Sequence, residues 1–453
     1  MNSKTINFFK QIALIPRESG HEEKISLFVE NFAKERGLDY IRDDYNNVII
    51  KKYVNDKDPV ILQAHLDMVC EKELNKDFNF NTDSIELIFK DGYITADGTT
   101  LGADDGIGVA QILNILDSDI DCSIEAIFTV NEETSMSGAS NIDLSNLKGK
   151  VMVNLDGFDA DTILLGSAGF TDIDMIMDYK YSQKGDNLYK ISISGLEGGH
   201  SGFDIDKNRG NSIVLLAKLI DMFNDYRIAS FRGGSKINVI PSEAYAIVST
   251  KDSIKEIFNR FLDNNQDKYN NLKIDFIPIS DKKEVLSIDD SKLFIESLLN
   301  FKHGVINKNS RGEVTTSENL ALVDLDNNII QVGLRSSIDS EERELINKLK
   351  EYCNNYNYKF NIIGHQPGFY TDENSILVKK MKDSYYEINS NYPDIESLHV
   401  AVEVGLIKEK IKDLEVVIIS PKIVGAHTIN ERVEIDSIEK CDRWLINFLK
   451  DYK

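Results

Sequence analysis

The 453-residue sequence lacks several features that mark secreted and membrane proteins. No run approaches the ~18 apolar residues of a membrane span, and the N-terminus has no uninterrupted apolar stretch like that of a signal peptide. The few cysteines lie far apart without paired spacing, so we expect a reducing compartment and no disulfide framework. We therefore expect a cytoplasmic protein. The cysteines are Cys70, Cys122, Cys353 and Cys441.

Positive charge is also scarce in this chain. Lysine and arginine number 52 against 75 aspartates and glutamates, which gives a formal net charge of −23. This balance argues against nucleic acid or an anionic membrane as the main partner. Hydrophobic residues make up 42% of the chain, enough for a packed core, and the length allows two or three domains.

The hydrophobic pattern changes twice along the chain. In residues 1–169 and 373–453, short apolar strands alternate with helices, which predicts an α/β domain with a mostly parallel sheet flanked by helices. Residues 170–372 follow a strand–helix–strand–strand–helix rhythm that predicts an inserted α+β domain. The first domain is therefore predicted to be discontinuous.

Residues capable of chemistry follow the apolar strands of the first domain. In an open α/β sheet, ligands bind at the carboxyl ends of the strands, so these side chains are predicted to meet at one edge. They comprise His65 and Asp67, the pair Glu132 and Glu133, Asp156, His427, and the pair Asp104 and Asp105 at the start of a helix.

This set has the composition of a metal site. Imidazole and carboxylate groups suit Zn²⁺, Mn²⁺ or Co²⁺, and two ions about 3.5–4 Å apart need a bridging carboxylate. With metal present, one of the adjacent acids Glu132 and Glu133 can be a ligand and the other a base, although spacing does not decide which. Taken singly, each signal has an ordinary explanation such as a solvated loop or a helix cap. Only their combination favours a metal site.

Several segments together resemble the di-zinc aminoacylase/carboxypeptidase superfamily of metallopeptidases, and within it the Xaa-His dipeptidases, also called cytosol non-specific dipeptidases. The segments AHLDMV, TADGTTLGADDGIGVA, VNEETSMSGA, NLDG and GAHTINERV carry the resemblance and occur in order over nearly the whole chain. IPRESGHEEKI, GLEGGHSGFDI, RSSIDS and HVAVEVGLI add to it. The resemblance implies that the inserted domain is a lid and that a homodimer forms through it.

The resemblance also implies a site for two divalent metal ions, Zn²⁺ in the first place and Mn²⁺ or Co²⁺ as alternatives. Glu132 is implied as the general base that takes a proton from a metal-bridging water and passes it to the leaving amine. Asp67 is implied to orient an imidazole. The implied ligands are His65 and Asp156 for one ion, Glu133 and His427 for the other, and Asp104 for both, with a cis bond between Asp104 and Asp105.

In the inserted domain, the resemblance implies three substrate-binding residues. His200 would stabilise the oxyanion, an interaction worth about 3 kcal/mol. Asn238 and Arg335 would bind the polar ends of the substrate, and Arg335 suits a carboxylate. Without the resemblance, His200 would more simply lie on a surface turn, and Arg335 could equally form a surface salt bridge. Glu403 also matches a family segment, but the sequence assigns it no role.

The chain departs from the family at two positions. Asp105 stands where an asparagine is common and adds a negative charge near the predicted site. Glu197 stands where a basic residue is common. Three further histidines are interpreted as loop or surface residues, and His399 is left undecided. The three are His21, His303 and His365.

The predicted function is metal-dependent hydrolysis of unblocked dipeptides, with Xaa-His dipeptides as one candidate substrate. A tripeptide aminopeptidase or an N-acyl amino acid deacylase would use the same site and remains an alternative. A non-catalytic peptide- or metal-binding protein is a further alternative. Glu132 argues against this last function, because binding alone needs no base.

Overall fold

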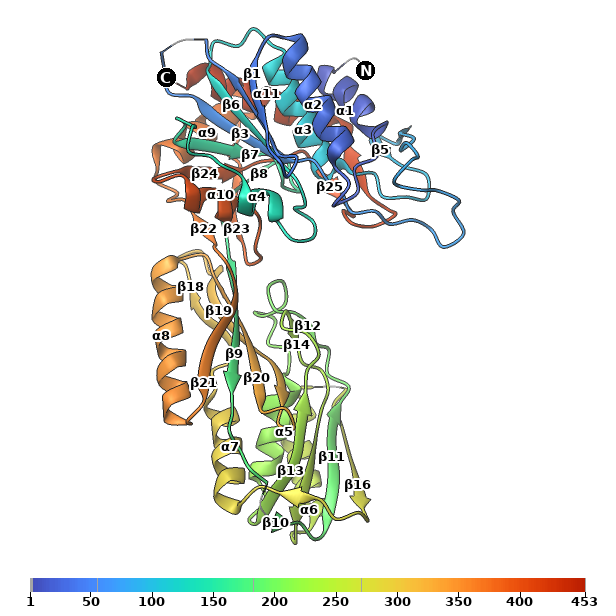
Figure 1. The fold of residues 1–453 in the computed structure, drawn as a ribbon, viewed down its shortest axis with the longest axis vertical. Coiled ribbons are helices and arrows are strands. Elements are labelled where there is room, and N and C mark those ends of the chain that lie inside the picture. Colours follow the sequence, from blue (N-terminus) through green and yellow to red (C-terminus); the bar gives the residue numbers. More distant parts are fainter. Residues whose placement is uncertain (1–2, 55, 182, 270, 453) are drawn as a thin grey trace. The chain divides into compact units, whose positions relative to one another are not determined.

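The computed structural model describes residues 3–54, 56–181, 183–269 and 271–452. The chain divides into two units (Figure 1). The second unit consists of Ala168–Gly368 with His399–Ala401, whereas the sequence predicted an insertion at 170–372. The first unit consists of Met1–Ser167, Phe369–Leu398 and Val402–Lys453.

The first unit is built on a mixed sheet in the order β1-β2-β6-β3-β7-β24-β8-β22, with β23 beside β8. The central strands β6, β3, β7 and β24 run parallel, and the outer strands β1, β2, β8 and β22 join antiparallel. This arrangement confirms the predicted mostly parallel α/β sheet. The strands are β1 (Asp39–Arg42), β2 (Val48–Lys52), β3 (Val60–His65), β6 (Ile124–Thr129), β7 (Val151–Asn154), β8 (Thr162–Ser167), β22 (Phe369–Tyr370), β23 (Asp394–Leu398) and β24 (Glu415–Ile418).

Helices cover both faces of this sheet, which is why its central strands are continuous apolar runs rather than alternating ones. On β7, Val153 belongs to the core beneath five helices, and its neighbour Met152 belongs to the core beneath two others. The first group is α1 (Lys4–Ala13), α2 (Glu23–Glu35), α3 (Ala103–Leu116), α9 (Ile376–Asn389) and α11 (Ile435–Asp451); the second is α4 (Ser137–Asn141) and α10 (Val404–Lys410).

A smaller sheet in the first unit has the order β25-β26-β5-β4. It matters for the site because the loop between β25 and β26 carries His427. Its strands are β4 (Ile88–Lys90), β5 (Tyr93–Thr95), β25 (Ile423–Val424) and β26 (Arg432–Glu434).

The second unit is an α+β fold, with helices packed on an antiparallel sheet in the order β16-β11-β15-β13-β19-β20-β9-β21, and with β18 beside β19. One apolar core joins the sheet to its helices. The helices are α5 (Ser212–Asp221), α6 (Ile254–Asn265), α7 (Ile288–Asn300) and α8 (Asp339–Asn355). The sheet consists of β9 (Gly169–Ile176), β11 (Leu188–Ser194), β13 (Tyr226–Gly233), β15 (Ala244–Thr250), β16 (Lys273–Ile279), β18 (Gly304–Lys308), β19 (Val314–Asp324), β20 (Ile329–Ser336) and β21 (Lys359–Gln366).

Two short ribbons complete the second unit. One pairs β10 (Gln183–Lys184) with β17 (Glu284–Val285). The other pairs β12 (Gly199–His200) with β14 (Val239–Ile240), and so joins two loops that carry predicted site residues.

The structure also describes the cysteines and tests each helix as a possible membrane span. All four cysteines are described and free, as predicted. Within the described part of the chain, no helix has both the length and the apolar character needed to span a membrane.

Candidate metal centre

Two histidines converge on the carboxylate of Asp104. His65 ends β3, and its Nε2 atom lies 3.1 Å from Oδ1 of Asp104. His427 lies in the loop between β25 and β26, and its Nε2 atom is 3.1 Å from Oδ2 of Asp104. Asp104 therefore presents one oxygen to each imidazole, an arrangement that suits a carboxylate shared by two cations.

Further carboxylates gather around this core. Asp156 joins His65 and Asp104 in one group, and Glu133 joins Asp104 and His427 in another. Within each group, potential ligand atoms from all members lie within 4.8 Å of one another. Such a set of imidazole nitrogens and carboxylate oxygens fits divalent ions of the zinc and manganese type. The structure thus brings together all five predicted ligands.

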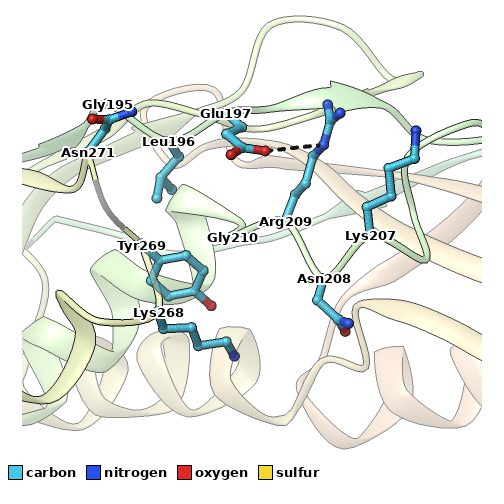
Figure 2. Close-up of a pocket in the computed structure, with 10 residues that line it drawn as sticks. All are labelled: Gly195, Leu196, Glu197, Lys207, Asn208, Arg209, Gly210, Lys268, Tyr269 and Asn271. Carbon is cyan, nitrogen blue, oxygen red and sulfur yellow. Dashed lines mark ion pairs between the residues drawn. The ribbon is translucent and has the colours of Figure 1, made fainter.

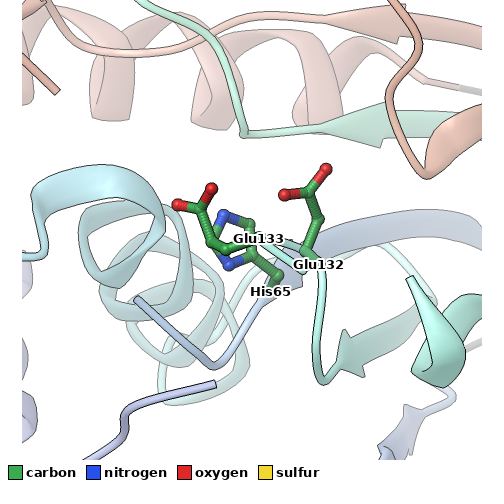
Figure 3. A group of neighbouring side chains, drawn as sticks. All are labelled: His65, Glu132 and Glu133. Atoms are coloured by element: carbon green, nitrogen blue, oxygen red, sulfur yellow. The ribbon is translucent and has the colours of Figure 1, made fainter. Parts of the chain in front are cut away.

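The turn after β6 brings both adjacent glutamates to the site. Asn131 has a positive φ of 57° there. The backbone N–H groups of Glu132 and Glu133 then donate to the two oxygens of Asp67, at 3.1 and 3.2 Å. Figure 3 shows both glutamate side chains projecting to the same side, next to the His65 ring, and the three residues form a further group of potential ligands.

Asp67 is fully buried and holds more than this turn. Its Oδ1 atom lies 3.4 Å from Nδ1 of His65, on the side of the ring away from Asp104. Its Oδ2 atom accepts a hydrogen bond of 2.7 Å from Ser19. The sequence predicted a contact of Asp67 with an imidazole, but it did not predict that the same carboxylate fixes the turn at Glu132 and Glu133.

The pKa values reflect a concentration of buried charge. Burial raises the pKa of Glu132 to about 8, and the nearby charges of Glu403, Glu133 and Asp104 act in the same direction. Hydrogen bonds to Asp104 and Glu133 raise the pKa of His427 to about 10. Burial would raise the pKa of Asp104, but hydrogen bonds from the two histidines outweigh it and hold the value below its ordinary range. The metal-free site therefore holds protons at neutral pH that a divalent cation would displace.

A buried polar layer crosses the strands that end at the site. The carboxylate of Glu403 accepts hydrogen bonds of 2.6 Å from Gln63 on β3 and from Thr129 on β6. Gln63 in turn accepts a hydrogen bond of 2.5 Å from Asn154 on β7. Glu403 is fully buried, and burial raises its pKa to about 7. It ties together strands whose ends carry His65 and the glutamate pair.

Asp105 has a structural role of its own. Its Oδ2 atom accepts the N–H of His65 and its Oδ1 atom the N–H of Gly108, both at 3.2 Å, so the side chain joins the end of β3 to the start of α3. Burial raises its pKa well above the ordinary value. Burial therefore opposes the added negative charge that the sequence predicted here. The bond from Asp104 to Asp105 is cis, as the resemblance implied.

The predicted substrate-binding residues of the second unit cluster around Ser201. Arg335 is 4% exposed, its Nε donates to the Ser201 hydroxyl at 3.2 Å, and its guanidinium lies over the Phe170 ring. The N–H of Ser201 donates to the carbonyl of Asn238 at 2.9 Å. Arg335 is therefore buried, and the alternative of a surface salt bridge is wrong.

His200 lies beside this cluster on β12, next to Ser201. Its Nδ1 atom accepts the N–H of Gly202 at 3.1 Å, which leaves Nε2 to carry the proton. Burial and the charge of Arg335 lower its pKa, so the ring is neutral at neutral pH. His200 can thus act as a neutral hydrogen-bond donor through Nε2.

Glu197 lies in the same glycine-rich segment but away from these contacts. It pairs with Arg209 at 3.6 Å on the wall of a pocket of about 180 Å³ in the second unit (Figure 2). The side chain of Glu197 is 76% exposed. The departure from the family at this position thus places an exposed acid opposite a cation.

Two other histidines differ in their surroundings. His303 lies in a loop, as predicted, but it accepts the N–H of Leu320 at 3.3 Å, and burial lowers its pKa to about 4. His399, left undecided from the sequence, lies 2.7 Å from the hydroxyl of Ser317 through Nε2. Burial, followed by the charge of Arg335, lowers the pKa of His399 to about 3.

Comparisons of sequence and structure relate this chain to known proteins. The sequence model of peptidase family M20/M25/M40 matches residues 61–451. The cytosol non-specific dipeptidase of Escherichia coli K12 is 30% identical over 468 residues, covering 98% of this chain and 96% of that protein. The crystal structure of aminoacylhistidine dipeptidase from Vibrio alginolyticus matches with a TM-score of 0.90 at 31% identity, over 99% of this chain and 96% of that one. Aminopeptidase PepT from Bacillus cereus, at 16% identity and a TM-score of 0.58 over 99% and 97% of the two chains, shares the fold.

Proposed function

Since the chain belongs to peptidase family M20/M25/M40, we propose that it is a metal-dependent dipeptidase that hydrolyses unblocked dipeptides. The observation that carries the proposal is Asp104 held between His65 and His427, with further buried carboxylates around it. The names of the two relatives that are 30% and 31% identical to this chain favour dipeptides over tripeptides and N-acyl amino acids. For the same reason we propose a cytosolic location.

The proposed centre holds two divalent ions, with zinc as the proposed metal. When bound, the ions would polarise the scissile carbonyl and lower the pKa of the attacking water. The chain's own residues hold and align this centre. His65 and Asp156 would bind one ion, Glu133 and His427 the other, and Asp104 both.

Glu132 is the proposed general base. Its carboxyl group lies with His65 and Glu133 but is not needed as a ligand, and a bound cation would lower its pKa from about 8 toward the range in which it can accept a proton from the attacking water. It takes a proton from the attacking water and delivers it to the leaving amine. Asp67 keeps this acid in place by accepting its backbone N–H.

For the second unit we propose a role in binding the substrate. The buried guanidinium of Arg335 suits the C-terminal carboxylate of a dipeptide, which a planar fork of donors can hold at two points. Nε2 of His200 would donate to the oxyanion as it develops. Asn238 would contact the other polar end. A homodimer stays a prediction that only the family resemblance supports.

The test combines metal titration with a substrate panel. Chelator-stripped protein is titrated with Zn²⁺, Mn²⁺ and Co²⁺ and assayed on dipeptides, including Xaa-His members, on a tripeptide and on an acetylated amino acid. Dipeptide hydrolysis should return as two equivalents bind. Activity confined to the tripeptide or to the acetylated amino acid would keep the metal centre but change the assigned substrate class. No hydrolysis of any of these compounds would overturn the proposal.

The variant Glu132→Gln separates binding from chemistry. It should bind two equivalents of metal like the parent, while kcat falls by about 10²–10⁴-fold, the usual contribution of a general base. Glu409→Gln, at an exposed position of the same unit, is the matched control and should leave both unchanged. A Glu132→Gln enzyme with parental kcat would refute the assignment of the base.

A further inference from the structure

Glu431, a buried acid that is not one of the proposed ligands, binds the backbone that leads to Asp104. Glu431 is 2% exposed. Its Oε2 atom accepts the N–H groups of Leu101 and Gly102 at 2.8 and 2.9 Å, and its Oε1 atom those of Ala103 and Asp104 at 2.8 and 3.2 Å. One carboxylate thus satisfies four successive donors at the start of α3.

Glu431 also belongs to the loop that carries His427. Its own N–H donates to the carbonyl of Thr428 at 3.1 Å, and the N–H of Thr428 donates to that of Gly425 at 3.2 Å. These bonds fold the loop between β25 and β26 into a tight turn. The two ligand-bearing segments around Asp104 and His427 are therefore joined through Glu431.

Arg17, a buried cation, donates hydrogen bonds to carbonyl groups of the same backbone. Arg17 is 3% exposed, and its Nη2 donates to the carbonyl of Gly102. Its Nη1 donates to the carbonyls of Leu66 and Asp67 at 3.0 and 2.6 Å, in the segment that follows His65. Arg17 therefore joins the segment of His65 to that of Asp104.

The close packing around Gly102 shows how little freedom this segment has. Gly102 adopts a positive φ of 69°, and a Cβ atom built there would lie 2.7 Å from the sulfur of Met68 and would also collide with Arg17. A carboxylate shared by two cations must aim both oxygens at once. Groups that orient metal ligands in this way affect metal affinity although they never touch the metal.

We propose that Glu431 and Arg17 are positioning residues that aim Asp104 at both metal ions and thereby set the affinity for the second ion. The proposal rests on the two-metal function proposed above. Burying two charges in a protein is costly unless their hydrogen bonds are satisfied. Here both charges bond to backbone N–H and C=O groups of the segments that carry His65 and Asp104, and Glu431 itself belongs to the segment that carries His427.

A purely structural role is the alternative, and the first unit offers a matched control for it. Glu125 is also fully buried and accepts backbone N–H groups, those of Lys148 and Gly149 at 3.0 and 2.9 Å, together with the hydroxyl of Tyr53 at 2.5 Å. It lies at the start of β6, at the opposite end of the strand from the site. Glu125→Gln therefore removes comparable buried contacts without touching the ligand-bearing segments.

The experiment compares the parent with Glu431→Gln and Glu125→Gln. Binding of Zn²⁺ to the stripped, full-length proteins is measured by competition with a chelator of known affinity, and urea unfolding is followed in parallel. Glu431→Gln should bind the first equivalent like the parent and the second about 10–100-fold more weakly. Glu125→Gln should lose stability but bind both equivalents like the parent.

The outcomes separate the positioning role from the proposed function. Parental affinity for both ions in Glu431→Gln, or equal weakening in Glu125→Gln, would overturn the positioning role alone. A parent that binds fewer than two ions would overturn the two-metal function and this inference with it. If Glu431→Gln does not fold, Arg17→Lys provides the same comparison, because it keeps the charge but loses the forked donors to the carbonyls.

Discussion

Replacing Glu318 by glutamine is expected to raise the free energy of unfolding, by an amount that grows with pH. Glu318 lies on β19 of the second unit and is 2% exposed. Burial raises its pKa to about 8 from an ordinary value of 4.5, and the charges of Lys302 and Lys348 offset only part of this effect. The folded protein therefore keeps a proton on Glu318 that the unfolded chain has already lost.

The sign and size follow from proton linkage. Between these two pKa values the folded state binds more protons, so the stability of the parent falls as pH rises, by about 1.4 kcal/mol per pH unit. Glutamine cannot ionise and removes this slope. The difference between Glu318→Gln and the parent should grow by about 2–3 kcal/mol from roughly pH 5.5 to 7.5, and level off above about pH 8.

Urea unfolding at a series of pH values measures this difference directly. Other titrating groups are common to both proteins and cancel, provided that the m-values agree. Glu351→Gln, at an exposed position on α8, is the control and should give a flat difference. A difference for Glu318→Gln that is equally independent of pH would show that the buried side chain is ionised in the folded protein and would refute the reasoning.

Two further predictions concern the metal centre. Asp67→Asn should lower kcat by about 10–100-fold while two equivalents of metal still bind. The reason is that one of the two oxygens that accept the N–H groups of Glu132 and Glu133 is replaced by an NH₂ group, which donates. A parental kcat would show that the turn does not depend on Asp67. Zinc binding at pH 7 should release protons and weaken as pH falls, because His427, with a pKa of about 10 in the metal-free protein, must lose its proton to become a ligand. Calorimetry in two buffers of different ionisation enthalpy measures this release, and its absence would argue against His427 as a ligand.

The sequence predicted the site because its signals are local. Each ligand follows a strand or opens a helix, and parallel strands bring their carboxyl ends together. Glu431 was not predicted although it lies in the quoted segment GAHTINERV. Its partners are backbone N–H groups more than 300 residues earlier in the chain, and backbone donors leave no trace in a sequence.

The second unit was harder to predict in detail. The strand–helix–strand–strand–helix rhythm predicted the α+β class, but it did not specify every element, and strands β13 and β16 and helix α7 are among those it left out. The edge strand β16 has no consistently buried face, and the alternation of polar and apolar residues in its sequence ends at Phe276, after which Ile277, Pro278 and Ile279 follow one another. Strand β13 is buried on both sides over most of its length yet contains Arg227 and Arg232, which interrupt the apolar run expected of such a strand.

The adjacent acids Glu132 and Glu133 illustrate how one turn can serve two purposes. Their backbone N–H groups are both bound by Asp67, which fixes the backbone from which both side chains reach the site. Without metal, burial and neighbouring charges keep the pKa of Glu132 high. A cation held by Glu133 would cancel part of that negative charge and lower the pKa of its neighbour. Two free carboxylates at adjacent positions repel each other. Here the same proximity makes the pKa of Glu132, the proposed base, depend on the ion that Glu133 would hold.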